Sequence, residues 1–423
     1  MSEIDTGETD TGGTPRTPDF IPHPWRPLAS ATIADGFVTV TWPDGVRFDA
    51  YSLWLAENAD GYGLEPSSRE STLEPRDLPH PGALVAAVVD GDGALALEWA
   101  GGRAARVHPG WLRYVADDRH LPNSQLPALT MWTGADFSEP PTLDGADILD
   151  DDDVLEAWLA LLVQYGLCRL VNTPTELDFV GRLVAHVGPI RDSNFGLVWS
   201  VQSKPDPDST AYTGLDLGQH TDLPTREVPP GYQFLHCVEN TVRGGWSRMS
   251  DGWAVAEAIR AEHPDAYEAL TTLEWVFMNR ARDAEHRWVG PIIDHGAPRQ
   301  PLTLRAFYPV RSAPHMDPAD IPRAYASLRV FAEMARDPRF QLAYPFRPGD
   351  LVGFDNRRIL HGRDAFESSG ARHLRGCYAD HDDFYSRLRV LRRGRPSPVD
   401  PPPTVHRSAA PAAPASAPQG VPA

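Results

Sequence analysis

The sequence predicts a mainly β protein with flanking helices, in which a small β-rich domain precedes a larger β-sandwich or barrel. Three observations support this fold class. Between residues 30 and 118, short apolar runs are separated by Asp-Gly and Gly-Gly pairs, which favour hairpin turns. From about 170 to 395, helical patterns alternate with β-like runs, and the β-like runs lie next to the polar motifs. No Gly-rich phosphate turn follows a strand-like run, which argues against a doubly wound nucleotide-binding sheet.

Composition sets the expected domain boundaries. Residues 1–29 and the Pro/Ala-rich residues 396–423 are predicted to be disordered tails, because they offer too little apolar surface for a core. The small β-rich domain is expected at 30–118 and the larger domain at 119–395. Within the larger domain, the acidic run Asp150–Asp153 is expected to cap a helix, since acidic side chains suit the positive end of a helix dipole.

Charge and residue counts exclude several classes of protein. The 423 residues include 39 basic and 58 acidic side chains, a net charge of −19, whereas a nucleic-acid-binding protein needs a basic surface. No apolar run approaches the roughly 20 residues that span a bilayer. The acidic start is unlike a secretory signal, and three cysteines make no disulfide framework. We expect a cytoplasmic protein without nucleic-acid or membrane partners.

A His-x-Asp pair, His220 and Asp222, is the first candidate for chemistry. Residues two apart on an extended strand point to the same face, so the two side chains could grip one metal ion from one side. The spacing alone has little weight, because chance supplies it elsewhere in the chain. The same pattern occurs at His263/Asp265, His315/Asp317 and His381/Asp383.

Distant partners distinguish the first pair from the others. His361 follows a β-like run far downstream, and Arg372 opens the next β-like run eleven residues later. Two imidazoles and one carboxylate form the facial triad of non-haem Fe(II) oxygenases, which leaves positions open for a co-substrate and O₂. An arginine beside such a site can form a bidentate ion pair with the far carboxylate of 2-oxoglutarate.

These motifs lie in a segment, from about 121 to 395, that resembles the γ-butyrobetaine dioxygenase branch of the taurine-dioxygenase-like Fe(II)/2-oxoglutarate oxygenases. The matching strings are WSVQSKPDPDSTAYTG, HTDLPTREVPPGYQFLHC, FDNRRILHGR and RHLRGCYAD. The resemblance implies a double-stranded β-helix (jelly-roll) fold and Fe(II) held by His220, Asp222 and His361. It also implies that Arg372 binds 2-oxoglutarate, with Ser247 of the Gly-Gly-Trp-Ser segment as a second contact.

The resemblance further implies an aromatic cage for a quaternary ammonium group. Such a cation cannot donate hydrogen bonds, so ring faces are its suitable partners. The positions that match the cage are Phe195, Trp199, Tyr212 and Tyr378. Phe195 stands where a Tyr is expected but keeps a usable ring face.

The match is weaker where the acid end of a substrate would bind. Ser209 stands where the family has an Asn, and Arg305 lies in the strand-like run that replaces a second Asn. An added arginine could favour a more highly charged acid such as a phosphonate. We therefore take Ser209 and Arg305 as candidate substrate contacts.

The 30–118 segment resembles the family's small accessory domain through YSLWLAEN and the pair Trp111-Leu112. Relatives with zinc there use three Cys and one His. The matching positions are Ala59, Gly61, Leu64 and Arg103, none of which is a zinc ligand in such sites, so we expect no zinc.

Three functional hypotheses remain open. In the first, the enzyme uses Fe(II), 2-oxoglutarate and O₂ to hydroxylate γ-butyrobetaine to L-carnitine. In the second, the same machinery oxidises a trimethylammonium phosphonate. In the third, the protein is a catalytically silent betaine-binding protein. All three expect a small quaternary ammonium ligand, and a homodimer is left open.

Overall fold

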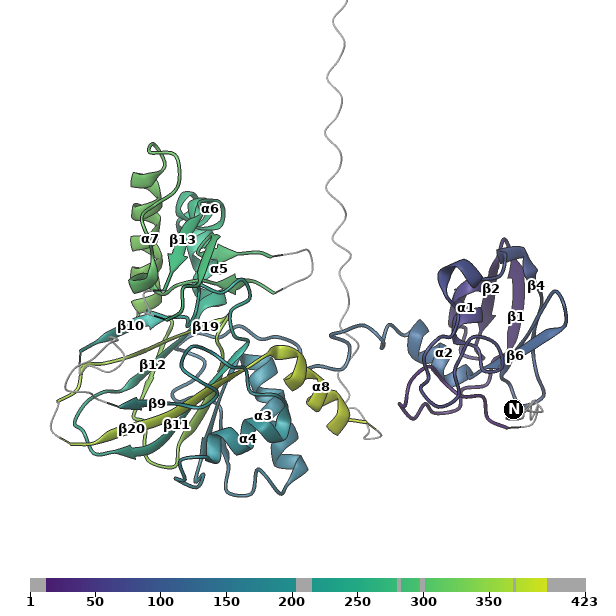
Figure 1. The fold of residues 1–423 in the computed structure, drawn as a ribbon, viewed down its shortest axis with the longest axis horizontal. Coiled ribbons are helices and arrows are strands. Elements are labelled where there is room, and N and C mark those ends of the chain that lie inside the picture. The colour runs from purple at the N-terminus through teal and green to yellow at the C-terminus, as the bar shows by residue number, and fades with distance from the viewer. Residues whose placement is uncertain (1–12, 203–214, 280–282, 297–300, 368–369, 394–423) are drawn as a thin grey trace, which may run out of the picture. The chain divides into compact units, whose positions relative to one another are not determined.

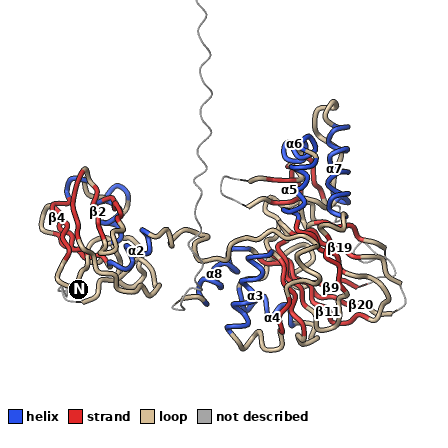
Figure 2. The backbone as a smooth tube through the Cα atoms, turned by 180° about the vertical axis from the view of Figure 1, so that it is seen from behind, coloured by secondary structure: helices blue, strands red, loops and turns tan. Residues whose placement is uncertain are grey.

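The computed structural model describes residues 13–202, 215–279, 283–296, 301–367 and 370–393 (Figures 1 and 2). The chain divides into two compact units, one containing the residues up to Gln125 and the other spanning Leu126–Arg392. Mainly β structure with flanking helices is the class expected from the sequence, and it is confirmed. In the described part of the chain, no helix has the length and apolar character needed to cross a bilayer.

The first unit is built from two three-stranded antiparallel sheets. Its strands are β1 (Ser30–Ala34), β2 (Phe37–Thr41), β3 (Arg47–Tyr51), β4 (Leu84–Val89), β5 (Leu95–Trp99) and β6 (Arg103–Val107). Its helices are α1 (Ser52–Asn58), α2 (Pro109–Ala116) and the short 3-10 turns η1 (Pro75–Asp77) and η2 (Pro81–Ala83). The Asp35-Gly36 and Gly101-Gly102 turns have positive φ, as hairpin turns require.

Residues 13–29, predicted to belong to a tail, pack against this unit. Leu28 is buried, and Trp25 meets His108 edge-on at 4.8 Å. The indole Nε1 of Trp25 also donates to the carbonyl of Asp92. A few apolar anchors thus order a Pro-rich segment whose average composition predicts disorder.

The second unit contains a six-stranded sheet in the order β7-β8-β18-β11-β20-β9 and a four-stranded sheet in the order β10-β19-β12-β17. The strands of the larger sheet are β7 (Thr142–Asp144), β8 (Leu167–Val171), β9 (Trp199–Gln202), β11 (Tyr232–Asn240), β18 (Leu351–Asp355) and β20 (Arg372–Ala379). Those of the smaller sheet are β10 (Leu217–His220), β12 (Ser247–Asp251), β17 (Gln341–Tyr344) and β19 (Ile359–Arg363). The pairs β13 (Trp275–Met278) with β14 (Arg287–Gly290), and β15 (Ile293–Asp294) with β16 (Thr303–Leu304), form two small ribbons.

Helices cover two sides of this unit. The helices are α3 (Asp152–Tyr165), α4 (Phe179–Val187), α5 (Gly252–Glu262), α6 (Pro264–Thr272), α7 (Ile321–Arg336) and α8 (His381–Leu391), with a 3-10 turn η4 (Tyr308–Val310). The helix expected at the acidic run is confirmed as α3, where the side chain of Asp151 accepts from the backbone N–H groups of Asp153 and Val154.

The side chains of the central strand β11 point alternately to the two faces of the larger sheet, and this alternation explains how the sheets and helices form layers. Phe234 packs with α3 and α8, stacking on Phe384 with ring centroids 5.3 Å apart. Leu235 and Cys237 belong instead to a cluster that contains Met249 of the four-stranded sheet. Successive strand residues point to opposite faces, so one face of the larger sheet meets helices and the other meets the smaller sheet. These two facing sheets position the polar side chains that line the cavity between them.

Candidate active site

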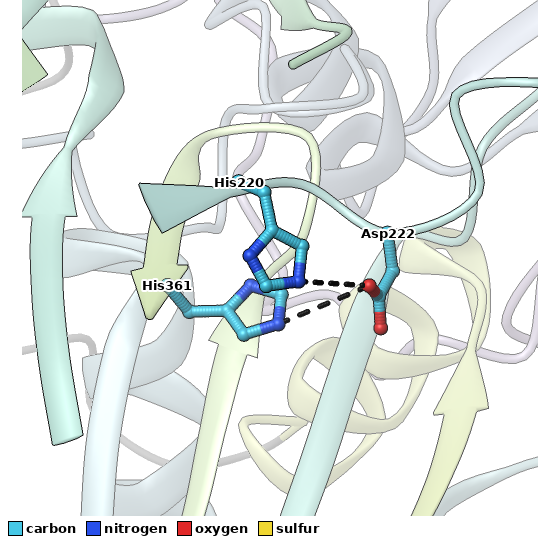
Figure 3. A group of neighbouring side chains, drawn as sticks. All are labelled: His220, Asp222 and His361. Carbon is cyan, nitrogen blue, oxygen red and sulfur yellow. Dashed lines mark ion pairs between the residues drawn. The ribbon is translucent and has the colours of Figure 1, made fainter. Parts of the chain in front are cut away.

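Strand pairing brings the three predicted metal ligands together (Figure 3). β10 and β19 are antiparallel neighbours, and His220 lies directly opposite His361. β10 ends at His220, so Asp222 lies in the following turn rather than on the strand face that the sequence suggested. Leu223, next in the chain, has φ of +54°, a left-handed conformation that is uncommon for this residue type. The sharp turn returns the Asp222 carboxylate to the two imidazoles.

The geometry of the three side chains fits a metal ion. The Asp222 Oδ1 atom lies 3.3 Å from Nε2 of His220 and 3.9 Å from Nε2 of His361. Bonds of about 2.1 Å set at right angles would separate ligand atoms by about 3 Å. No second group of three such ligands occurs among the described residues. Two nitrogens and one carboxylate suit Fe(II) and leave half of an octahedron open.

Each histidine is held in a form that can bind metal. The His220 Nδ1 atom lies 2.9 Å from the carbonyl oxygen of Gly218, and donation to this oxygen leaves the Nε2 lone pair facing Asp222. Burial, together with the neighbouring imidazole of His220, lowers the pKa of His361 to about 3. The His361 imidazole is therefore neutral at physiological pH, as a metal ligand must be.

The Asp222 carboxylate is ionised and anchored through both its side chain and its main chain. Burial by itself raises the pKa of Asp222, but interactions with His220, His361 and Tyr378 outweigh it and lower the pKa well below the usual range. The Asp222 N–H donates to Oδ1 of Asn356 at 2.7 Å, and Asn356 Nδ2 donates back to the Asp222 carbonyl at 3.0 Å. Asn356 is fully buried. Its role was missed in the sequence, although it lies in the matching string FDNRRILHGR.

A cavity of about 190 Å³ adjoins the triad, and two buried arginines line it. Arg372 opens β20 and is 7% exposed, burial lowers its pKa, and its Nε has no hydrogen-bond partner among the described residues. Arg363 is 6% exposed, and burial and the charge of Arg372 lower its pKa to about 10. Their guanidinium carbons lie 5.7 Å (Arg372) and 4.6 Å (Arg363) from the ring centre of Phe366. Two neighbouring buried cations fit a ligand with negative charge.

Ser247 lines the cavity together with Arg363 and Arg372. It lies opposite Arg363 in the β12–β19 pairing and is 8% exposed. The structure therefore brings Arg372 and Ser247 to one cavity with the triad, and it adds Arg363, which was missed in the sequence. The signal was present: Arg363 stands two residues after His361 on the same strand and so shares its face.

Aromatic side chains line another part of the cavity. Phe195, Trp199 and Tyr378 all contribute to its wall. The Trp199 ring centroid lies 5.3 Å from that of Tyr378 and 6.5 Å from that of Phe195. Trp199 pairs across β9 and β20 with Gly376, where an added Cβ would lie 2.4 Å from the indole, so only glycine admits the ring there. Tyr212 and Ser209 lie outside the described residues.

Arg305 is not among the described residues that line the cavity, in contrast to the expectation that it contacts substrate. It is 3% exposed, and its Nη atoms donate to the carbonyls of Pro224, Arg226 and Glu227 at 2.7–3.0 Å. Those carbonyls belong to the loop that follows Asp222. The Arg305 donors therefore stabilise this loop instead of facing a substrate anion.

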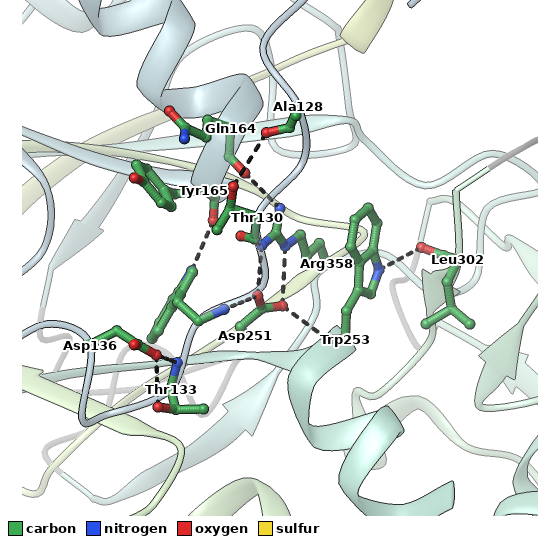
Figure 4. Close-up of polar contacts among 11 residues, drawn as sticks. Ala128, Thr130, Thr133, Asp136, Gln164, Tyr165, Asp251, Trp253, Leu302 and Arg358 are labelled. Carbon is green, nitrogen blue, oxygen red and sulfur yellow. Dashed lines mark hydrogen bonds and ion pairs between the residues drawn. The ribbon is translucent and has the colours of Figure 1, made fainter. Parts of the chain in front are cut away.

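A buried ion pair fixes the strands behind the site (Figure 4). Arg358 and Asp251 are both fully buried, with Nη2 and Oδ2 2.6 Å apart. Arg358 also donates to the carbonyls of Thr130 and Gln164, while Asp251 accepts from the backbone N–H of Trp253 at the start of α5. Asp251 ends β12, which carries Ser247, and Arg358 precedes β19, which carries His361. The pair thus joins the ends of two strands that bear site residues.

Facing sheets, a 2-His-1-carboxylate cluster and an arginine-lined cavity define an Fe(II)- and 2-oxoglutarate-dependent dioxygenase. The model of the Taurine catabolism dioxygenase TauD, TfdA family matches residues 124–378, and the chain belongs to this family, as the sequence motifs predicted.

Relatives of known name extend the match over most of the chain. The gamma-butyrobetaine dioxygenase of Pseudomonas sp. (strain AK-1) is 39% identical over 372 residues, which cover 87% of this chain and 97% of that protein. The Homo sapiens gamma-butyrobetaine dioxygenase is 33% identical, with 60% of this chain and 67% of that protein covered. The mitochondrial trimethyllysine dioxygenase of Gallus gallus is 28% identical, with 82% and 84% covered.

Proposed function

We propose that this dioxygenase hydroxylates γ-butyrobetaine to L-carnitine. The observation that carries the proposal is the aromatic wall of Trp199, Tyr378 and Phe195, which shares one cavity with the His220, Asp222 and His361 cluster. Two relatives that match most of their own length are named gamma-butyrobetaine dioxygenases, which supports this choice of substrate.

The residues of this chain divide the work of catalysis. His220, Asp222 and His361 would hold Fe(II), which supplies, with 2-oxoglutarate and O₂, the chemistry that converts a C–H bond to an alcohol. Arg372 and Arg363 would pair with the far carboxylate of 2-oxoglutarate. In the overall reaction one oxygen atom of O₂ enters the alcohol and the other enters succinate, with release of CO₂.

The aromatic wall would position the substrate. Ring faces attract a trimethylammonium group electrostatically, and they do so without hydrogen bonds. Binding of this group fixes one end of the substrate, so that a carbon along its chain is held near the metal. The rings also exclude water from the reacting carbon.

We further propose that the two facing sheets form the double-stranded β-helix of the family, and that the residues 30–118 are an accessory domain without zinc. At the matched zinc positions, Ala59 and Leu64 are buried. Gly61 has φ of +94°, and a Cβ added there would lie 3.2 Å from the Ala104 carbonyl oxygen. Arg103 stacks 4.0 Å over the Tyr62 ring. The matched zinc positions thus make apolar and cation–π contacts in this unit.

Elemental analysis of protein purified without added metal should therefore find no stoichiometric zinc. The physical reason is that none of the four matched side chains offers a thiolate or an imidazole. The matched control is the same protein after incubation with zinc and gel filtration, which should return to the zinc-free state. One zinc retained per chain would contradict the prediction.

Replacing Trp199 by Leu should raise the KM for γ-butyrobetaine by about one order of magnitude, since a desolvated cation–π contact contributes on the order of 1–2 kcal/mol. The affinity for 2-oxoglutarate should stay unchanged, because Arg372 and Arg363 remain in place. Steady-state succinate assays and 2-oxoglutarate titrations measure the two quantities. Gly376→Ala should have a similar effect on KM, because the added methyl displaces the indole without altering its chemistry.

A neutral analogue serves as the control for this prediction. A tert-butyl group in place of trimethylammonium has the same shape without the charge. It should bind the wild-type protein much more weakly than the cation does, yet lose little further in the Trp199→Leu variant. If the cation and the analogue bind the wild type equally well, the rings provide only apolar contacts. The proposal that they recognise a quaternary ammonium group would then be wrong.

A further inference from the structure

Tyr378 belongs to two parts of the site at once. Its ring lies in the aromatic wall beside Trp199, while its hydroxyl donates to the Oδ2 atom of Asp222 at 2.8 Å. The side chain is almost fully buried, at 2% exposure. The proposed binding of a cation uses only the ring and leaves the hydroxyl unexplained.

The backbone around Tyr378 leaves the hydroxyl little freedom. β20 pairs with β11, where Gln233 lies opposite Tyr378. On the other side, the N–H of Arg191 donates to the Tyr378 carbonyl at 2.8 Å. The ring is confined further by Trp199. Because the backbone and the ring of Tyr378 are both restrained, its hydroxyl has a defined position and can orient a neighbouring carboxylate through a hydrogen bond.

The two oxygens of Asp222 have different surroundings. Oδ1 faces the Nε2 atoms of both histidines, whereas Oδ2 accepts from Tyr378. A carboxylate rotates easily about its Cβ–Cγ bond when nothing holds the outer oxygen. It can then turn away from a metal, or bring both oxygens to it and fill a position that a co-substrate needs. Hydrogen bonds to metal ligands suppress such rotation and tune affinity.

We propose that Tyr378 is a positioning residue for the metal ligand Asp222. Its hydroxyl holds Oδ2, so that Asp222 would offer a bound metal only Oδ1 and would leave the other positions open, while its ring lines the cavity. Asn356 fixes the main chain of the same residue, so Asp222 is restrained at both ends. The inference rests on the metal centre of the family and not on the identity of the substrate.

The test is a Mn(II) titration of the wild type and of Tyr378→Phe, without substrate or 2-oxoglutarate, followed by the paramagnetic resonance signal of free Mn(II). Phe keeps the ring and removes only the hydroxyl. Loss of a hydrogen bond to a metal ligand should weaken Mn(II) binding by about 10-fold or more. Tyr232→Phe is the matched control, since this buried tyrosine lies on β11 and packs with Phe384, and it should bind Mn(II) as the wild type does.

A kinetic readout separates positioning from substrate contact. With γ-butyrobetaine, Tyr378→Phe should lower kcat and leave KM nearly unchanged, because the ring face remains. Mn(II) affinity within twofold of the wild type in Tyr378→Phe would overturn the inference, and so would an equal loss in Tyr232→Phe. If the wild type turns over no γ-butyrobetaine, the proposed substrate falls, but the Mn(II) comparison still decides the role of the hydroxyl.

Discussion

Asp222→Ala should abolish succinate formation and weaken metal binding by more than about 100-fold, beyond the loss typical of a residue that only supports a ligand. Asp222 is the only anionic member of the triad, and its Oδ1 atom faces both imidazoles. Its removal leaves two neutral nitrogens, which hold Fe(II) poorly. Succinate release and Mn(II) titration give the two readouts, and circular dichroism checks that the variant is folded.

The chain supplies a matched control in another His-x-Asp pair. Asp317 follows His315 at the same spacing, but its carboxylate accepts the backbone N–H of Ala319 and joins no metal-binding cluster of the described residues. Asp317→Ala should therefore keep wild-type turnover and metal affinity. Turnover near that of the wild type in Asp222→Ala, or equal losses in the two variants, would contradict the metal assignment.

Arg358→Met should reduce the free energy of unfolding of the Leu126–Arg392 unit by about 3–5 kcal/mol. The substitution keeps much of the side-chain volume but leaves the fully buried Asp251 carboxylate without its positive partner. It also removes donors from the carbonyls of Thr130 and Gln164. Urea unfolding followed by tryptophan fluorescence measures the loss.

An exposed ion pair on α7 provides the comparison. Arg323 pairs with Glu268 across α6 and α7, and its side chain is 43% exposed. Water screens such pairs, so Arg323→Met should change the free energy of unfolding far less. Equal effects of the two substitutions would mean that the Arg358–Asp251 pair does not hold the strands behind the site.

The sequence identifies the metal ligands because their chemistry restricts both residue type and order along the chain. His220, Asp222, His361 and Arg372 were found from spacing and from matching strings, and the structure places them at one cavity. The supporting residues were harder to find. The side-chain amide of Asn356 forms hydrogen bonds with the backbone of Asp222, which is far away in the sequence. No local sequence pattern predicts such a contact.

Arg305 and Arg363 show the limit of reading side-chain direction from sequence. Both are arginines in strand-like runs close to functional motifs. Arg363 lies on the cavity face, while Arg305 donates to carbonyls of the loop after Asp222. Their different roles depend on which carbonyls and cavities the folded chain brings near, so only the tertiary structure distinguishes them.

Strand order in the larger sheet also cannot be predicted from local sequence patterns. Turn residues and the alternation of apolar and polar residues predict individual strands. They do not predict that β18 lies between β8 and β11, because β18 follows both strands far downstream in the chain. Such pairing follows from the burial of whole faces, which no single segment encodes. The general class was predictable, whereas the arrangement that forms the cavity was not.

The most direct test offers the Fe(II)-reconstituted protein γ-butyrobetaine, trimethyllysine and 2-trimethylaminoethylphosphonate in parallel, with 2-oxoglutarate and O₂. Succinate is quantified, and the molecular mass of each product is measured by mass spectrometry. We expect γ-butyrobetaine to gain one oxygen atom with one succinate formed per product, at a higher kcat/KM than the other two substrates. Preferred oxidation of the phosphonate, or metal-bound protein that forms no product from any of the three, would contradict the proposed function.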